Sequence, residues 1–80
     1  MRFEKFSELI SNISHIPEEY IKEKASFRND LGIDSLQMVN LFVELSERTG
    51  IGFDQFVRAK DLETVGGVYQ IILRGIQNEN

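Results

Sequence analysis

Apolar residues recur at steps of three and four along most of this chain, and that spacing commits it to amphipathic α-helices. The first such segment predicts a helix over roughly residues 2–14. The second predicts a helix over residues 35–49, which Gly50 follows at the position of a C-terminal cap. A third begins after Thr64, a residue suited to the N-cap. The apolar positions that define these faces are Phe3, Phe6, Leu9, Ile10, Ile13, Leu36, Val39, Leu41, Phe42, Val43, Leu45, Val65, Val68, Tyr69, Ile71, Ile72 and Ile76. The chain is therefore predicted to be all-α, with three main helices.

Two stretches interrupt the helical spacing. Residues 14–34 contain Pro17 and Gly32 among isolated apolar side chains, which predicts a long loop with one helical turn after Pro17. Residues 54–60 have room for about two turns, and Asp54 is expected to cap this short helix. Because 80 residues hold one core, residues 1–80 are expected to form a single domain. A loop this long in so small a domain is usually functional.

The apolar arc of residues 35–49 is wider than contact with one core requires. We expect part of it, among Leu36, Met38 and Val43, to form an exposed strip. Aromatic side chains more often belong to a core than to a ligand site. The aromatic residues therefore expected in the core are Phe3, Phe6, Phe27, Phe42, Phe53, Phe56 and Tyr69. Separation of the apolar residues of this helix and of the last one could also open a pocket for a fatty chain.

Charge and residue usage disfavour several classes of ligand. The formal net charge of −4 and the pI near 4.9 argue against binding to a nucleic-acid backbone and favour partners rich in Lys and Arg. With no Cys and one His, the chain lacks a disulfide framework and the usual ligands of a metal site. The first residues lack the apolar stretch of a signal peptide, and no segment has the length of a membrane span. We therefore expect a cytoplasmic protein that binds neither nucleic acid nor membrane.

Motifs of catalysis and of cofactor binding are incomplete in this sequence. Gly50 and Gly52 have no third glycine at the spacing of a dinucleotide-binding loop. A calcium loop that started at Asp30 would have Ser35 in place of its required glycine. Ser35 also lacks the flanking glycines of a hydrolase nucleophile, and His15 is expected on the surface with no role. The sequence therefore favours a protein that is not an enzyme and has no catalytic residues.

Ser35 lies where the long loop becomes the second helix. The first backbone N–H groups of a helix lack intrahelical partners and carry partial positive charge, so a phosphate attached to a serine at this end is favourably placed. Serine is also a preferred N-cap, so the same residue is explained by a structural role alone. Position by itself leaves both interpretations open.

Several segments match one family jointly. They are the first amphipathic helix, the apolar helix over residues 35–49, a Gly-Ile-x-Phe turn, and the sequences Ala25-Ser26-Phe27, Asp30-Leu31-Gly32, Asp34-Ser35-Leu36 and Thr64-Val65-Gly66. Through them the chain resembles the acyl and peptidyl carrier proteins over nearly its whole length. The resemblance implies a four-helix bundle of three main helices and one short one, with the long loop between the first two. It also implies that a phosphopantetheinyl transferase attaches the 4′-phosphopantetheine arm of coenzyme A to Ser35.

The implied function is that of a substrate shuttle. A domain without Cys cannot form a thioester itself, so the thiol would come from the arm. The resemblance implies a discrete acyl carrier protein that moves thioester-bound intermediates between enzymes of a fatty-acid, polyketide or related pathway. Asp34 would position the metal or a transferase contact, and its charge also suits a place just before a helix N-terminus.

The second helix is the partner-binding element that the resemblance implies. Its residues expected at the contact are Leu36, Gln37, Asn40, Val43, Glu44 and Glu47. The implied partners are the transferase, an acyl-loading ligase or transferase, and ketosynthase or condensation-type enzymes, with the carrier itself a monomer. Gln37 and Asn40 stand where typical fatty-acid carriers have acids, and Arg48 adds a positive charge, which weakens steering toward a basic partner.

Other functions remain open from the sequence. The departures on the second helix favour a specialised pathway, and a stand-alone peptidyl or aminoacyl carrier is one alternative. An unmodified helical module that binds a protein through its apolar strip is another, although the intact Asp34-Ser35-Leu36 motif argues against it. A small enzyme would need converging acid, base and nucleophile, for which only scattered carboxylates are available.

Overall fold

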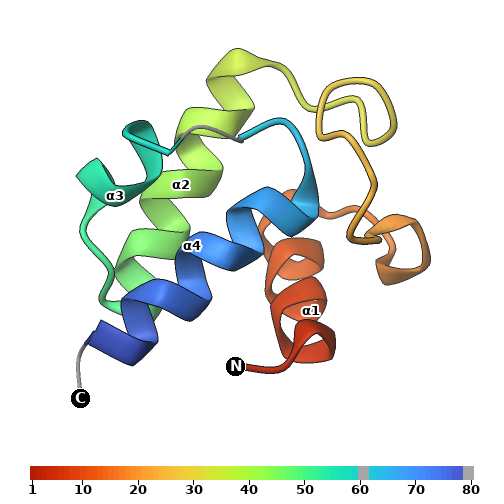
Figure 1. The fold of residues 1–80 in the computed structure, drawn as a ribbon. Coiled ribbons are helices and arrows are strands. Elements are labelled where there is room, and N and C mark those ends of the chain that lie inside the picture. Colours follow the sequence, from red (N-terminus) through yellow and green to blue (C-terminus); the bar gives the residue numbers. More distant parts are fainter. Residues whose placement is uncertain (60–61, 79–80) are drawn as a thin grey trace.

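The computed structural model describes residues 1–59 and 62–78 of the chain. Its elements are α1 (Phe3–Ser14), a 3₁₀ turn (Glu18–Tyr20), α2 (Ser35–Thr49), α3 (Phe53–Val57) and α4 (Val65–Asn78). In Figure 1 α4 crosses in front of α2, with α1 and α3 on opposite sides of this pair and the long loop beyond α1. The predicted all-α fold of three main helices and one short one is confirmed, and the described residues contain no strand. None of the described helices has the length and apolar character needed to cross a membrane.

The bounds of the two first main helices follow from their terminal residues. α1 stops at His15, whose left-handed backbone (φ 63°) lets its N–H reach the Ser11 carbonyl oxygen. His15 is exposed, as expected. α2 stops at Gly50, which adopts φ 77° and donates its N–H to the Ser46 carbonyl oxygen at 2.9 Å. A residue without a Cβ takes this conformation at little cost, so Gly50 ends α2 at the predicted place.

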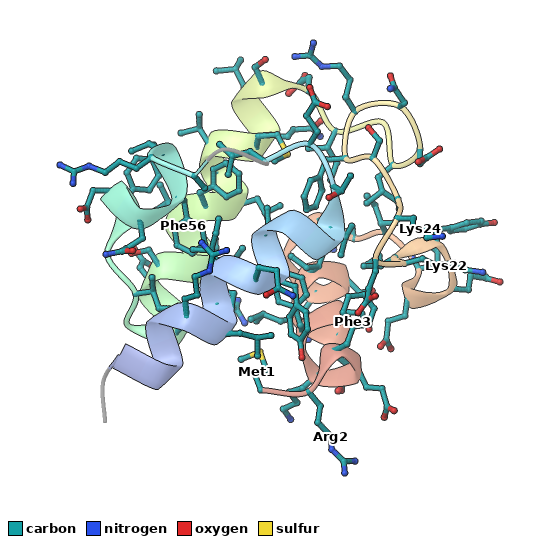
Figure 2. The ribbon with its side chains drawn as sticks, in the orientation of Figure 1. Met1, Arg2, Phe3, Lys22, Lys24 and Phe56 are labelled. Carbon is teal, nitrogen blue, oxygen red and sulfur yellow. The ribbon has the colours of Figure 1, made fainter. Side chains whose placement is uncertain are left out.

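The core lies where the four helices meet, and it includes side chains from the long loop. Its buried residues are Phe6, Ile10, Ile21, Phe27, Ile33, Leu41, Phe42, Leu45, Ile51, Phe56, Val65, Val68, Ile71 and Ile72. Two aromatic groups join elements: Phe42 of α2 stacks on Phe56 of α3 with ring centroids 5.5 Å apart, and Tyr69 of α4 contacts Phe3 and Phe6 of α1. The labelled Phe56 lies between α3 and α2 in Figure 2. These contacts join α2 to α3 and α1 to α4.

The short helix differs from its prediction. It begins at Phe53 with Gly52 as its N-cap, so the assignment of Asp54 as the cap is wrong. Asp54 lies in the first turn instead, where its negative charge suits the positive end of the helix. Phe53 was expected in the core but is 37% exposed, whereas Phe56, also expected there, is fully buried. The end predicted at Lys60 lies outside the described residues.

The long loop is fastened to the start of α4 by backbone hydrogen bonds. Phe27 N–H donates to the Glu63 carbonyl oxygen at 2.9 Å, and Val65 N–H donates to the Ala25 carbonyl oxygen at 3.0 Å. Gly66 N–H reaches the Glu23 carbonyl oxygen at 2.8 Å, an approach so close that a Cβ at Gly66 would lie 2.9 Å from the same oxygen. Figure 1 shows the segment before α4 running alongside the loop. This fastening fixes the part of the loop that leads into α2.

Candidate functional site

The candidate site is the first turn of α2, where Ser35 is the first helical residue and is exposed. Asp34 is the N-cap: its Oδ1 accepts from the Gln37 backbone N–H at 2.9 Å. The Gln37 side chain completes a capping box, because its Oε1 accepts from the Asp34 N–H at 3.0 Å. The interpretation of Ser35 as the cap is therefore wrong. Its hydroxyl is left at the helix end without a capping role.

A turn in the loop brings Arg28 to Ser35. The turn is closed by the Asp30 carboxylate, which accepts from the Ser26 N–H at 2.6 Å, and by the Ile33 N–H, which donates to the Phe27 carbonyl oxygen at 2.8 Å. Arg28 Nη2 donates to Ser35 Oγ at 3.0 Å, and both residues are exposed. Arg28 was not predicted as a site residue, because nothing in its spacing from Ser35 along the sequence indicates that the loop folds back.

A pocket of about 420 Å³ lies beside Ser35. Its polar lining residues are Ser26, Arg28, Asn29, Ser35 and Glu63, and its apolar ones are Phe27, Ile33, Met38, Phe42 and Leu62. The pocket therefore lies between the loop, α2 and the segment before α4. Among the described residues, those that line the pocket include none from α4, so the pocket does not correspond to the expected separation of α2 from the last helix. An apolar wall with a polar side is suited to a chain that carries polar groups along an otherwise apolar length.

An exposed face of α2 extends from Ser35 along the helix. Leu36 is 83% exposed, and Val39 and Val43 are at least partly open to solvent on the same face. The predicted exposure of Leu36 and Val43 is confirmed. The prediction for Met38 is wrong, because this side chain packs against the core and lines the pocket. Val39 takes its place. We call Leu36, Val39 and Val43 the α2 strip.

Polar residues border the α2 strip. Gln37, Asn40 and Glu47 are exposed, and Glu44 is half-buried with its carboxylate 3.4 Å from Nε of Arg48. Gln37 is already engaged in the capping box, and Arg48 offsets the charge of Glu44. Glu47 is therefore the acid on this side of α2 with the least local compensation in the described contacts. Groups of three or more residues able to hold a metal ion are absent from the described part of the chain.

Removing the Asp34 carboxylate is expected to destabilise the domain. Asp34→Ala should lower the free energy of unfolding by about 1 kcal/mol, because the Gln37 N–H loses its acceptor. Asp34→Asn keeps an oxygen acceptor and should retain most of this stability. Urea unfolding followed by circular dichroism measures both variants. Equal losses in the two would contradict the capping role.

A family model and individual relatives of known name both match most of this chain. The family model for a phosphopantetheine attachment site matches residues 4–70. A relative named acyl carrier protein from Saccharopolyspora erythraea is 37% identical over 71 residues, which cover 89% of this chain and 74% of the relative. The acyl carrier protein of Treponema denticola is 37% identical over 70 residues, 88% of each chain, and that of Acidothermus cellulolyticus is 33% identical over 66 residues, 82% of this chain and 77% of the relative. The residues matched by the family model include the loop turn, Asp34 and Ser35.

Proposed function

Since the chain belongs to the acyl carrier protein family and contains its phosphopantetheine attachment domain, we propose that Ser35 is the residue that receives the 4′-phosphopantetheine. Members of this family are carriers and not enzymes, and phosphopantetheine is their cofactor. The single observation that supports Ser35 most is that its hydroxyl is exposed on the first residue of α2 while Asp34 does the capping. A group attached there leaves the helix start intact.

The surroundings of Ser35 fit the cofactor. Its phosphate would lie at the positive end of α2, next to the guanidinium of Arg28. The pocket beside Ser35 offers both polar and apolar walls to the pantetheine beyond the phosphate. When bound, the arm supplies the terminal thiol on which acyl groups are held as thioesters. A chain without Cys has no thiol of its own for this purpose.

Attachment needs little from this chain beyond a positioned hydroxyl. In the proposed attachment, Ser35 Oγ would form a bond to the phosphorus of coenzyme A that bears pantetheine, and the diphosphate bond would break so that the adenosine bisphosphate leaves. The hydroxyl proton would pass to a base of the transferase, which would also bring Mg²⁺. Asp34 uses Oδ1 for the cap, and a carboxylate has a second oxygen for a metal or transferase contact. Capping and contact are therefore compatible roles for Asp34.

The test is an intact-mass spectrum of the chain before and after incubation with coenzyme A, Mg²⁺ and a broad-specificity phosphopantetheinyl transferase. We expect a gain of one phosphopantetheine, located at Ser35 by fragmentation. A folded chain that gains no mass with several transferases would contradict the proposal. That result would favour the unmodified interaction module, for which the α2 strip is the binding surface.

We further propose that the loaded domain, formed by residues 1–80 as one monomeric unit, shuttles acyl groups between cytoplasmic enzymes. Fatty-acid, polyketide and related pathways are the candidates, with an acyl-loading ligase or transferase and a ketosynthase as partners. A peptidyl or aminoacyl carrier remains the alternative, with a condensation-type enzyme in that place. The curated relatives carry the name acyl carrier protein, which supports acyl cargo.

Partner contact is proposed to use the α2 strip and the acids beside it. Leu36→Ala should lower kcat/KM for loading by the transferase about fivefold to tenfold, because an exposed apolar side chain next to the reacting serine is suited to anchor a partner. The free energy of unfolding should change by about 0.5 kcal/mol or less, because Leu36 is 83% exposed. Val57→Ala, an exposed valine on α3, is the matched control. Unchanged loading of Leu36→Ala would contradict this docking surface.

A further inference from the structure

Arg28 is the one described cation whose side chain contacts Ser35. Its Nη2 donates to Ser35 Oγ at 3.0 Å, and the closed turn from Ser26 to Ile33 keeps the two residues together. Lys22 and Lys24 belong to the same loop, yet Figure 2 places both far from the start of α2. The loop therefore directs one positive charge to the hydroxyl that is proposed to be modified.

The guanidinium has donors to spare for an anion. Arginine carries five N–H donors and one of them serves Ser35 Oγ. Within the part of the chain that the structure describes, Arg28 forms no ion pair. Asp30 and Asp34, the carboxylates closest to Ser35 along this part of the sequence, accept from the backbone N–H groups of Ser26 and Gln37. Neither forms an ion pair with Arg28 in the described part of the chain, so the guanidinium keeps donors for an anion.

Attachment changes what Ser35 can offer to Arg28. A free hydroxyl accepts a hydrogen bond well, but once the phosphodiester forms, Oγ becomes a bridging ester oxygen and the negative charge resides on the non-bridging phosphate oxygens. These oxygens belong to the phosphorus bonded to Oγ itself, so they lie within the reach of a side chain that already contacts Oγ. Guanidinium and phosphate form shorter and stronger hydrogen bonds than neutral pairs.

We propose that Arg28 binds the phosphate of the attached arm and directs the start of the arm along the loop side of the pocket. The inference rests on the proposed attachment at Ser35. Arg28 and Asn29 line the pocket that Ser35 also lines, so a phosphate held by Arg28 places the next part of the arm at this pocket. Arg28 is a positioning residue of the cofactor.

The test compares ³¹P NMR spectra of the loaded wild-type chain and of loaded Arg28→Ala, Arg28→Lys and Lys24→Ala. Complete loading of each sample is first verified by intact mass. We expect the phosphodiester resonance of Arg28→Ala to be displaced from that of the wild type, Arg28→Lys to lie between them, and Lys24→Ala to match the wild type. Because both groups are exposed, the wild-type resonance should move toward that of Arg28→Ala when salt is raised from about 0.02 M to about 0.5 M.

A thermal measurement separates this role from a purely structural one. Binding of the phosphate by Arg28 should make the Tm difference between loaded and unloaded protein more positive in the wild type than in Arg28→Ala. A purely structural role of Arg28 would lower the Tm of loaded and of unloaded Arg28→Ala by the same amount. Loaded wild type and loaded Arg28→Ala with the same ³¹P shift, or with the same Tm difference, would overturn the inference alone. A wild-type chain that gains no mass would overturn the proposed attachment and this inference with it.

Discussion

Ser35→Ala is expected to lose attachment of phosphopantetheine completely while the domain stays folded. Ser35 Oγ is the atom proposed to bond to phosphorus, and alanine offers no hydroxyl in its place, so the expected effect on loading is all or none. The effect on stability should be small, about 0.5 kcal/mol or less, because Asp34 is the cap and Ser35 is an exposed first-turn residue. Alanine is also the better helix former, which offsets the lost hydrogen bond from Arg28.

Intact mass after incubation with coenzyme A and transferase measures the loading, and urea unfolding measures the stability. The matched control is Ser46→Ala, which removes a serine from the same helix, where Oγ donates to the Ile51 carbonyl oxygen. Ser46→Ala should gain one phosphopantetheine like the wild type. A mass gain by Ser35→Ala would mean that another hydroxyl is the attachment site.

Phe56→Ala is expected to cause the largest loss of stability among single changes in α3, about 3–5 kcal/mol. Phe56 is fully buried and stacks on Phe42 at an interplanar angle of 11°. A domain of this size has a free energy of unfolding of about 4–12 kcal/mol, so the variant would lose a large share of it. Phe42 also lines the pocket beside Ser35, and loss of its stacking partner should loosen that wall.

The control for this prediction lies in the same helix. Phe53→Ala removes the same atoms from a residue that is 37% exposed, and it should cost about 1 kcal/mol or less. Urea unfolding of both variants, followed by circular dichroism, gives the two losses of free energy. Similar losses in Phe53→Ala and Phe56→Ala would contradict the assignment of Phe56 alone to the core. Unfolding of Phe56→Ala at the same urea concentration as the wild type would contradict the predicted loss of stability.

The sequence predicted the long helices well because their signals agree with one another. The apolar spacing of α1 and α2 and the glycine after α2 indicate the same bounds, and the structure has them within a residue of those predicted. The short helix was harder, since Gly52 and Asp54 are both acceptable N-caps and lie only two residues apart. Five helical residues carry too few apolar positions to settle this.

The candidate site was predicted in part for a similar reason. Asp34 and Ser35 are both good N-caps, and their order at the helix start depends on the hydrogen bond that Asp34 makes with Gln37. Their attachment and contact roles stay predictions. Arg28 was not predicted as a site residue, because its contact with Ser35 arises from the folded turn and not from a helical repeat. Val39 was missed as part of the exposed strip because a wide apolar arc does not reveal which of its members the neighbouring helices cover.

The backbone hydrogen bonds between the loop and the start of α4 have a consequence for folding during synthesis on the ribosome. Ser35 and all of α2 emerge before Glu63 and Val65, whose backbone groups hold Phe27 and Ala25. A nascent chain that ends after α2 lacks these partners, so its loop is free of the anchor that sets the turn beside Ser35. Ser35 is therefore synthesised before the residues that fix its surroundings. An enzyme that loads the cofactor can bind the folded site only after the chain has been synthesised through the start of α4.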